Sequence, residues 1–149
     1  MIDKVILDKI SSYIEYRYRS LHETKLKLRQ LKLSDAEQTE IIAYLLEKGF
    51  LDEDKFITAF VRGKFFHKYW GKQKIRYGLS YHQVSQEIVE KIISREISSE
   101  DYERTILRLI SKKIGGQNPS ELTQLKKYQV SQYLISHGFS YEEFTKYLS

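Results

Sequence analysis

The stretch LEKGFLDEDKF, residues 46–56, contains the end of one helix and the start of the next. Apolar residues at three and four residue spacing precede it, and Gly49 followed by Phe50 is typical of a left-handed helix C-cap whose next residue packs back on the helix. Asp52 then stands where the N-cap of a second helix is expected. The stretch therefore predicts a helix, a tight turn and another helix.

The same signals recur along the whole chain of 149 residues. Apolar residues repeat at helical spacing in nearly every segment, and no stretch alternates for long enough to predict a strand. Four helix starts carry the capping-box pattern, in which Ser and an acid three residues later satisfy each other's backbone N–H groups, namely Ser20, Ser34, Ser98 and Ser140. We predict an all-α fold with helices at 3–18, 21–31, 35–48, 53–68, 72–80, 86–95, 99–114, 119–136 and 141–148.

The pattern of apolar residues also repeats at long distance. The segment from Ile75 to Ile92 matches the segment from Val130 to Tyr147 at a shift of 55 residues, and an earlier segment fits it at a shift of 51. Units of this size bury their apolar faces against each other and form elongated modules. We predict a single domain, 1–149, with an N-terminal helix at 3–18 and three-helix units near 20–68, 72–114 and 119–148, the last cut short by the C-terminus.

Composition narrows the class of protein. The chain has no cysteine, no apolar run near 18 residues, and no basic segment followed by a hydrophobic stretch at its N-terminus. These features predict a cytoplasmic protein without a disulfide framework, a membrane span or a secretory signal. We expect a monomer that makes no contact with a membrane.

Candidate catalytic and cofactor residues are few. The histidines His22, His67, His82 and His137 have no metal-ligand spacing, and we interpret them as surface or packing residues. Gly63-Lys64 and Gly71-Lys72 lack the upstream glycine and the following Ser or Thr of a phosphate-binding loop. The sequence therefore predicts no metal, no cofactor and no enzymatic activity.

Charge is distributed unevenly. The chain has 25 basic and 20 acidic residues, yet residues 55–86 contain seven basic residues and no acid, interleaved with aromatics. We interpret the aromatics at the start of this acid-free window as core, and its later cations as a surface for a polyanion or an acidic protein. The candidate partner-binding residues are Arg62, Lys64, Lys68, Trp70, Lys72, Lys74 and Arg76. A second basic cluster at 17–29 contains acids as well, and for it we favour a solvated helix face.

Several motifs occur in a distinctive order and spacing. They are Arg19-Ser20-x-x-Glu23 with Lys27-Leu28, the stretch 46–56 with Ala59-Phe60-Val61-Arg62, Gly71-x-x-Lys74-Ile75-x-x-x-Leu79, Lys112-Lys113, and His137-Gly138-Phe139. Together they resemble the RecX family of bacterial regulators, over about residues 10–148. The chain departs from the family pattern at Glu53, Ile57 and Lys72, and at Lys32 and Gln83, where the family often ends a helix with Gly. These last two residues predict caps that strain a non-Gly residue or close differently.

The resemblance implies a tandem of three-helix repeats that lies in the groove of the RecA recombinase filament on DNA. It also implies a non-enzymatic regulator that limits filament extension and suppresses ATPase, strand-exchange and coprotease activities. The residues themselves leave a second hypothesis open, a direct binder of single- or double-stranded DNA without recombinase regulation.

Overall fold

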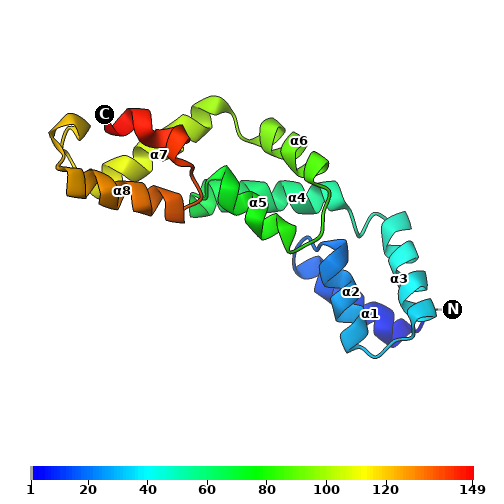
Figure 1. Cartoon of the computed structure of the whole chain (residues 1–149). Coiled ribbons are helices and arrows are strands. Elements are labelled where there is room, and N and C mark those ends of the chain that lie inside the picture. The colour runs from blue at the N-terminus through cyan, green and yellow to red at the C-terminus, as the bar shows by residue number, and fades with distance from the viewer. Residues whose placement is uncertain (1) are drawn as a thin grey trace.

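The computed structural model describes residues 2–149, and every regular element in this range is helical (Figure 1). This confirms the predicted all-α class. The α-helices are α1 (Lys4–Tyr16), α2 (Leu21–Gln30), α3 (Asp35–Glu47), α4 (Glu53–Arg62), α5 (Lys72–Ser80), α6 (Gln86–Glu96), α7 (Ser99–Ile114), α8 (Gln124–Ser136) and α9 (Tyr141–Phe144). Short segments are the π-helix η1 (Gly63–His67) and the 3₁₀ helices η2 (Pro119–Glu121) and η3 (Thr145–Leu148). Within residues 2–149, no helix is both long and apolar enough to span a bilayer.

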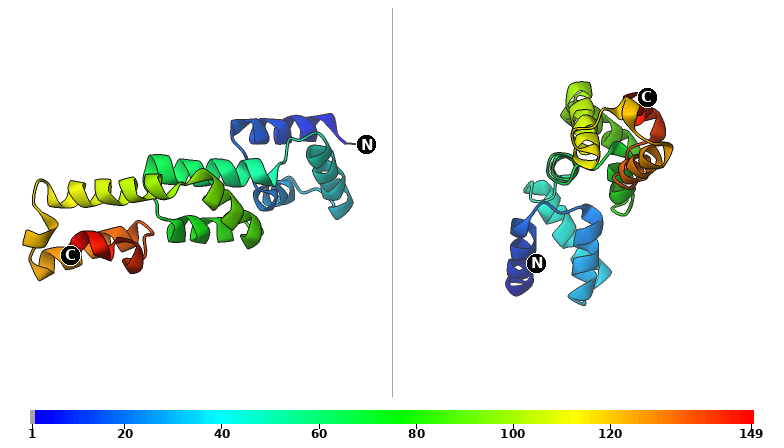
Figure 2. Two further views of the ribbon diagram at one scale, coloured as in Figure 1. Left: turned by 90° about the horizontal axis from the view of Figure 1, so that it is seen from above. Right: turned by 90° about the vertical axis from the view of Figure 1, so that its left-hand side faces the viewer.

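The molecule is elongated and bent (Figures 1 and 2). Helices α1 to α3 form one end, α4 to α6 the middle, and α7 to α9 the other end, so that the two chain termini lie far apart. A long shape of this kind offers an extended surface in place of one deep pocket.

Two separate hydrophobic cores hold the molecule together. Ile10, Leu28, Ile41, Leu45 and Leu51 form the core of α1 to α3, a part that we call the N-terminal unit (residues 2–51). The larger core contains buried residues from every helix from α4 to η3 except η2, and residues 52–149 together form the main body. The helices of the N-terminal unit thus share a core with each other and not with α4. The predicted repeat frame of 20–68, 72–114 and 119–148 stays a prediction.

Helix starts follow the predicted caps closely. Ser20 and Ser34 form complete capping boxes with Glu23 and Glu37. The Glu143 carboxylate accepts a hydrogen bond from the Ser140 backbone N–H (2.8 Å). At Ser98 the hydroxyl accepts from the Asp101 backbone N–H, but the Asp101 carboxylate accepts from Arg104 (3.0 Å) and does not return to Ser98. Arg104, one turn further along α7, therefore competes with the Ser98 backbone N–H for the Asp101 carboxylate.

Two predicted helices are interrupted. The segment 53–68 changes from α4 into the π-helix η1, and 119–136 is split, because Leu122 is buried in an extended conformation and Thr123 starts a new helix. The Thr123 hydroxyl accepts a hydrogen bond from the Lys126 backbone N–H (3.1 Å). Burial of Leu122 is a tertiary effect that the Asn118-Pro119 start signal does not reveal.

The glycine caps were correctly predicted, but one of the two residues that follow them was not. Gly49 and Gly138 have φ values of +75° and +99°, in the left-handed region. Phe139 packs into the core at 1% exposure, as expected, whereas Phe50 remains 53% exposed. The local cap is the same in both cases, so the neighbouring unit decides whether the aromatic ring is covered.

Three other residues adopt a positive φ. Lys32 (+59°) and Gln83 (+55°) do so at the helix ends where the sequence predicts strain. Tyr69 (+57°) does so between η1 and α5, and sequence reasoning did not identify it. A left-handed conformation disfavours a residue with a Cβ atom, so each of these turns is strained.

Candidate interaction surface

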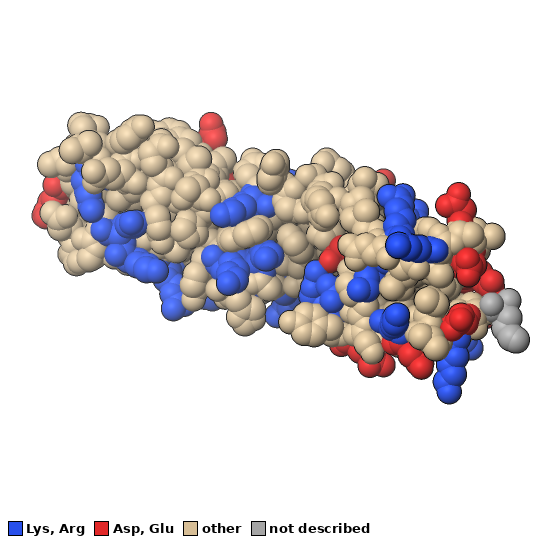
Figure 3. Space-filling model, turned by 90° about the horizontal axis from the view of Figure 1, so that it is seen from below, with Lys and Arg blue, Asp and Glu red and all other residues tan. Residues whose placement is uncertain are grey.

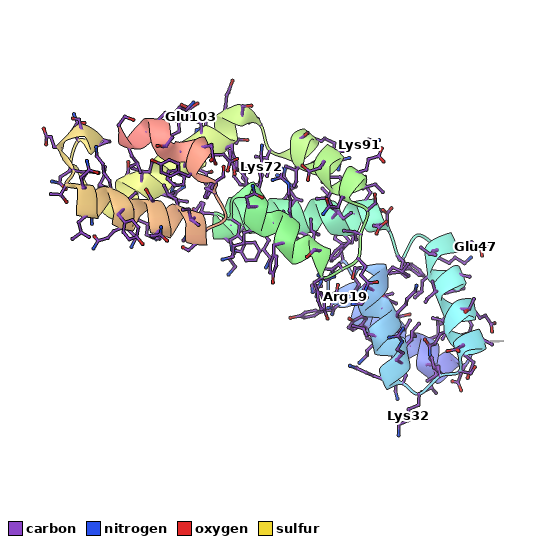
Figure 4. All side chains as sticks on the ribbon, in the orientation of Figure 1. Arg19, Lys32, Glu47, Lys72, Lys91 and Glu103 are labelled. Carbon is purple, nitrogen blue, oxygen red and sulfur yellow. The ribbon has the colours of Figure 1, made fainter. Side chains whose placement is uncertain are left out.

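The seven candidate residues lie at the end of α4, in η1, in the connection between η1 and α5 (Lys68 and Trp70) and in the first turns of α5, at the middle of the molecule. In Figure 4, Lys72 lies in this middle region, between the N-terminal unit and the α7 to α9 end. The chain reverses direction after η1, at Tyr69, and the start of α5 then meets the end of α8. The seven residues thus lie close together around one chain reversal, but their side chains contact different partners.

The two arginines of the set are paired with acids on α6. Arg76 makes a two-pronged interaction with Glu90 (both N···O distances 2.8 Å), and Arg62 donates to Glu96 (3.0 Å). Hydrogen bonding from Arg76 lowers the pKa of Glu90, and hydrogen bonds from Arg95 and then Arg62 lower the pKa of Glu96. Two acids from outside the acid-free window, Glu90 and Glu96 on α6, therefore lie next to its arginines in the folded protein.

Two lysines flank the single tryptophan. The ammonium groups of Lys64 and Lys74 lie 4.8 and 4.7 Å from the Trp70 ring centroid, within cation–π range. Lys74 also donates to the Ser136 carbonyl (3.3 Å). Neither ammonium has an acidic partner among residues 2–149. Their charges remain available to an external anion.

Trp70 is half-buried and belongs to the edge of the main core. Its ring meets Phe60 edge-on (6.4 Å between centroids). The Trp70 ring therefore packs between the core and the ammonium groups of Lys64 and Lys74, and only part of its surface is open to a partner.

The remaining two lysines differ from each other. Lys72 lies over the Tyr102 ring (4.5 Å), and its backbone N–H donates to the Tyr102 hydroxyl (3.1 Å), which in turn donates to Glu143 (3.1 Å). Burial raises the pKa of Tyr102, so this hydroxyl stays protonated. Lys68 is exposed and has no ionic partner among the described residues. We call Lys64, Lys68, Lys72 and Lys74 the lysine cluster.

Basic side chains extend beyond this cluster. Figure 3 shows one face of the molecule on which Lys and Arg recur from the α8 end, across the middle, to α2, while Asp and Glu gather mainly at the N-terminal end. At that end Arg17 and Arg19 both pair with Glu23, so the charge of residues 17–29 is partly neutralised. The side chains of Arg19 and Glu23 are only 11% and 12% exposed, so the solvated helix face favoured from the sequence does not describe these two residues. Burial opposes ionisation of Glu23, but hydrogen bonds from Ser20 and Arg17 leave its pKa lowered.

Among the described residues, the four histidines do not form a metal site, and one of them has a structural role. Within the part of the chain that the structure describes, no group of three His, Cys, Asp or Glu side chains is placed to hold a metal ion. His82 joins the two cores, because its Nδ1 lies 2.8 Å from the Ser20 hydroxyl and its ring lies 4.7 Å from the Phe56 ring. Burial lowers the pKa of His82, and the nearby Glu23 carboxylate partly opposes this.

Sequence reasoning missed one surface feature, a groove of about 720 Å³ between the N-terminal unit and α4. We call it the inter-unit groove. Its walls come from the end of α1, the α3–α4 turn, α4, η1 and His82, and include Tyr18, Phe50, Phe60 and Lys64. No local pattern predicts it, since it exists only because the two units meet at an angle.

The fold and surface together define an elongated all-α protein of tandem helical units with a basic face. Comparison with known proteins places it more closely. Residues 52–92, which cover α4, α5 and most of α6, match the family model described as RecX, second three-helix domain. The crystal structure of RecX from Lactobacillus salivarius superposes with a TM-score of 0.81 at 20% identity, covering 95% of this chain and 90% of that one. A second RecX crystal structure gives a TM-score of 0.80 at 16% identity, with coverages of 94% and 69%.

Curated relatives agree with this assignment. The chain is 25% identical to Regulatory protein RecX of Clostridium acetobutylicum over 134 residues, which are 89% of this chain and 62% of the relative. It is 29% identical to that of Clostridium botulinum over 133 residues, with coverages of 87% and 60%. The chain thus spans about three-fifths of the length of these relatives. The family model, the curated relatives and the solved structures together support a RecX family protein, in agreement with the motif order.

Proposed function

We propose that this protein is a non-enzymatic regulator that binds the RecA–DNA filament and inhibits its extension, ATPase, strand-exchange and coprotease activities. Membership of a family whose curated members are named regulatory proteins supports the regulatory class. The observation that carries the binding proposal is the lysine cluster at the middle of a long basic face, in which Lys64 and Lys74 flank Trp70 and form no salt bridge with a described acid.

An elongated basic body suits a filament for electrostatic and geometric reasons. A nucleoprotein filament presents phosphates and acidic protein groups along a continuous groove, and a long surface can meet many of them at once. Charges without internal partners lose less on binding, because no intramolecular ion pair has to be broken.

The candidate residues do not contribute equally to the proposed contact. The lysine cluster provides the main contacts, and Trp70 holds Lys64 and Lys74 in place. Arg62 and Arg76 take a secondary part, because each already shares its charge with a carboxylate on α6.

Charge reversal tests the proposal. The triple variant Lys68→Glu, Lys72→Glu, Lys74→Glu reverses the net charge of the four-lysine cluster, since one Lys and three Glu remain. The control Lys4→Glu, Lys9→Glu, Lys91→Glu makes the same change in net charge at exposed positions outside the acid-free window. We expect the first variant to lose inhibition of ATP hydrolysis by a preformed cognate RecA filament, and the control to retain it. Circular dichroism and thermal melting verify that both variants fold.

Unchanged inhibition by the folded cluster variant would reject the assignment of the site. The second hypothesis, direct DNA binding, predicts a different pattern. Fluorescence anisotropy would then show binding to naked DNA that weakens by about 0.7 to 0.9 log units per log unit of salt for each phosphate contacted. The cognate filament's ATPase would be unaffected.

A further inference from the structure

The inter-unit groove contains aromatic surface that the fold itself does not use. Phe50 and Tyr18 are 53% and 55% exposed and both line the groove, one from the α3–α4 turn and one from the segment after α1. Phe60 is half-buried and adds a third ring from α4. Exposed aromatic rings gathered in a concave site of several hundred Å³ are typical of binding surfaces.

Phe50 has the clearest exposed apolar surface that a partner could cover. Its counterpart after the other glycine cap, Phe139, is fully covered, whereas Phe50 lies tilted against Tyr44 (6.4 Å between ring centroids) and lines the groove. Covering its exposed half would remove apolar area from water, which is favourable at about 25 cal/mol per Å². A partner that fills the groove would gain this burial.

The charges at the groove limit what the partner can be. Lys64 lies at the edge shared with the lysine cluster, and its ammonium has no acidic partner among the described residues. The other end carries the Glu15 carboxylate, and Arg17 there is already paired with Glu23. A polynucleotide strand along the groove would bring phosphates toward the Glu15 carboxylate, which repels them. An apolar side chain followed by a single carboxylate meets both the rings and Lys64.

We infer that the inter-unit groove binds a large apolar side chain flanked by Asp or Glu on a protein segment of the partner. The inference rests on the proposed function, with the recombinase filament as the source of that segment. The lysine cluster would supply long-range attraction, and the groove would supply a short-range apolar anchor. Such an anchor is less sensitive to salt than the cluster, since burial of apolar area is not screened.

One substitution separates a peptide occupant from a nucleic acid. Ala59 is exposed on α4 and lines the groove, so Ala59→Arg fills the groove and adds a cation at a helical position that accepts Arg well. Ala43→Arg, at an exposed position of α3 outside the groove, is the matched control. Binding to a preformed cognate RecA filament on single-stranded DNA is measured by co-sedimentation at two salt concentrations.

We expect Ala59→Arg to raise the dissociation constant about tenfold or more, the range of an interface anchor, and Ala43→Arg to leave it within about twofold. Equal binding by wild type and Ala59→Arg would overturn the groove inference while leaving the proposed function intact. Tighter binding by Ala59→Arg alone would indicate a nucleic acid occupant and overturn it as well. Failure of the wild type to bind the filament would reject the proposed function and this inference with it.

A photo-cross-linker identifies the occupant directly. With p-benzoylphenylalanine in place of Phe50, irradiation of the complex should link the protein to a recombinase peptide that contains an apolar residue next to Asp or Glu. Cross-links to the DNA, or to recombinase peptides without such a pair, would overturn the inference. The same probe at Tyr141, exposed on α9, is the control for random surface contact.

Discussion

Gly71 and Gly138 pack backbone against backbone, and this contact joins the start of α5 to the end of α8. The Gly71 N–H donates to the His137 carbonyl (2.7 Å), and the Gln73 N–H donates to the Gly138 carbonyl (3.1 Å). A Cβ atom at Gly71 would lie 2.4 Å from the carbonyl carbon of Gly138. The lysine cluster is built on this junction, because Lys72 and Lys74 follow Gly71 directly.

Gly71→Ala should therefore destabilise the protein by about 2 kcal/mol or more, since the three atoms that clash with the new Cβ are backbone atoms of Gly138 and Phe139 and cannot move away easily. Gly63→Ala is the matched control. Gly63 has a helical φ of −63° and no heavy atom within 4 Å of an added Cβ, so the change should be neutral or stabilise by about 0.5–1 kcal/mol. Urea denaturation of the two variants checks this, and equal stabilities would contradict it.

Gln83→Gly should stabilise the protein by roughly 1 kcal/mol. Gln83 holds a φ of +55° after α5, and glycine removes the Cβ strain of the left-handed conformation. The converse change, Gly49→Ala, meets no clash but introduces the same strain at a φ of +75°, and should destabilise by a similar amount. Thermal melts measure both, and a loss of stability in Gln83→Gly would show that the turn is not strained.

Contact between the N-terminal unit and the main body should weaken in acid through His82. Burial lowers the pKa of His82 below the unfolded value near 6.5, so the folded state favours the neutral ring. Its contribution is fully present above pH 6.5 and is lost as the pH falls through the lowered folded pKa. The unfolding temperature at pH 5.5 relative to pH 8 should drop less in His82→Gln than in wild type. The exposed His67 provides the control, because His67→Gln should keep the wild-type pH dependence.

Glu90→Gln should strengthen binding to the RecA–DNA filament by a few fold. It removes the carboxylate that pairs with Arg76 and thus adds one free cation beside the lysine cluster. The pair is largely exposed, so stability should change by less than about 1 kcal/mol. Glu87→Gln, whose carboxylate pairs with Lys91 on the same helix, makes the same charge change without freeing Arg76. Equal gains in both variants would show that only net charge matters.

Local signals predicted the helices well because the interactions that start and stop a helix span only a few residues. Ser20, Ser34 and Asp52 accept hydrogen bonds from backbone N–H groups three residues away, so their chemistry is readable from the chain itself. The predictions were wrong at positions where contacts between residues far apart in the chain decide the local structure. Leu122 is drawn into the main core and splits a predicted helix, and Phe50 stays exposed because the neighbouring unit leaves a groove beside it.

The candidate site was predicted in part for the same reason. Residues 55–86 do carry a local excess of positive charge, and the chain turn at Tyr69 does bring it together. Sequence counting treated Arg62 and Arg76 like the lysines, since Glu90 and Glu96 lie beyond the window. In space these two acids are direct neighbours of the arginines, and the free charge narrows to the lysine cluster.

The sequence by itself determined the all-α class, most of the helix starts, the resemblance to the RecX family and the location of the basic segment. Each of these depends on side-chain identity and short-range spacing. Only the tertiary structure decided which cations keep their charge free, how Trp70 and the lysines meet, and that a groove opens beside Phe50. Charge pairing and burial depend on distance through space, and helices that are far apart in the chain set that distance when they pack.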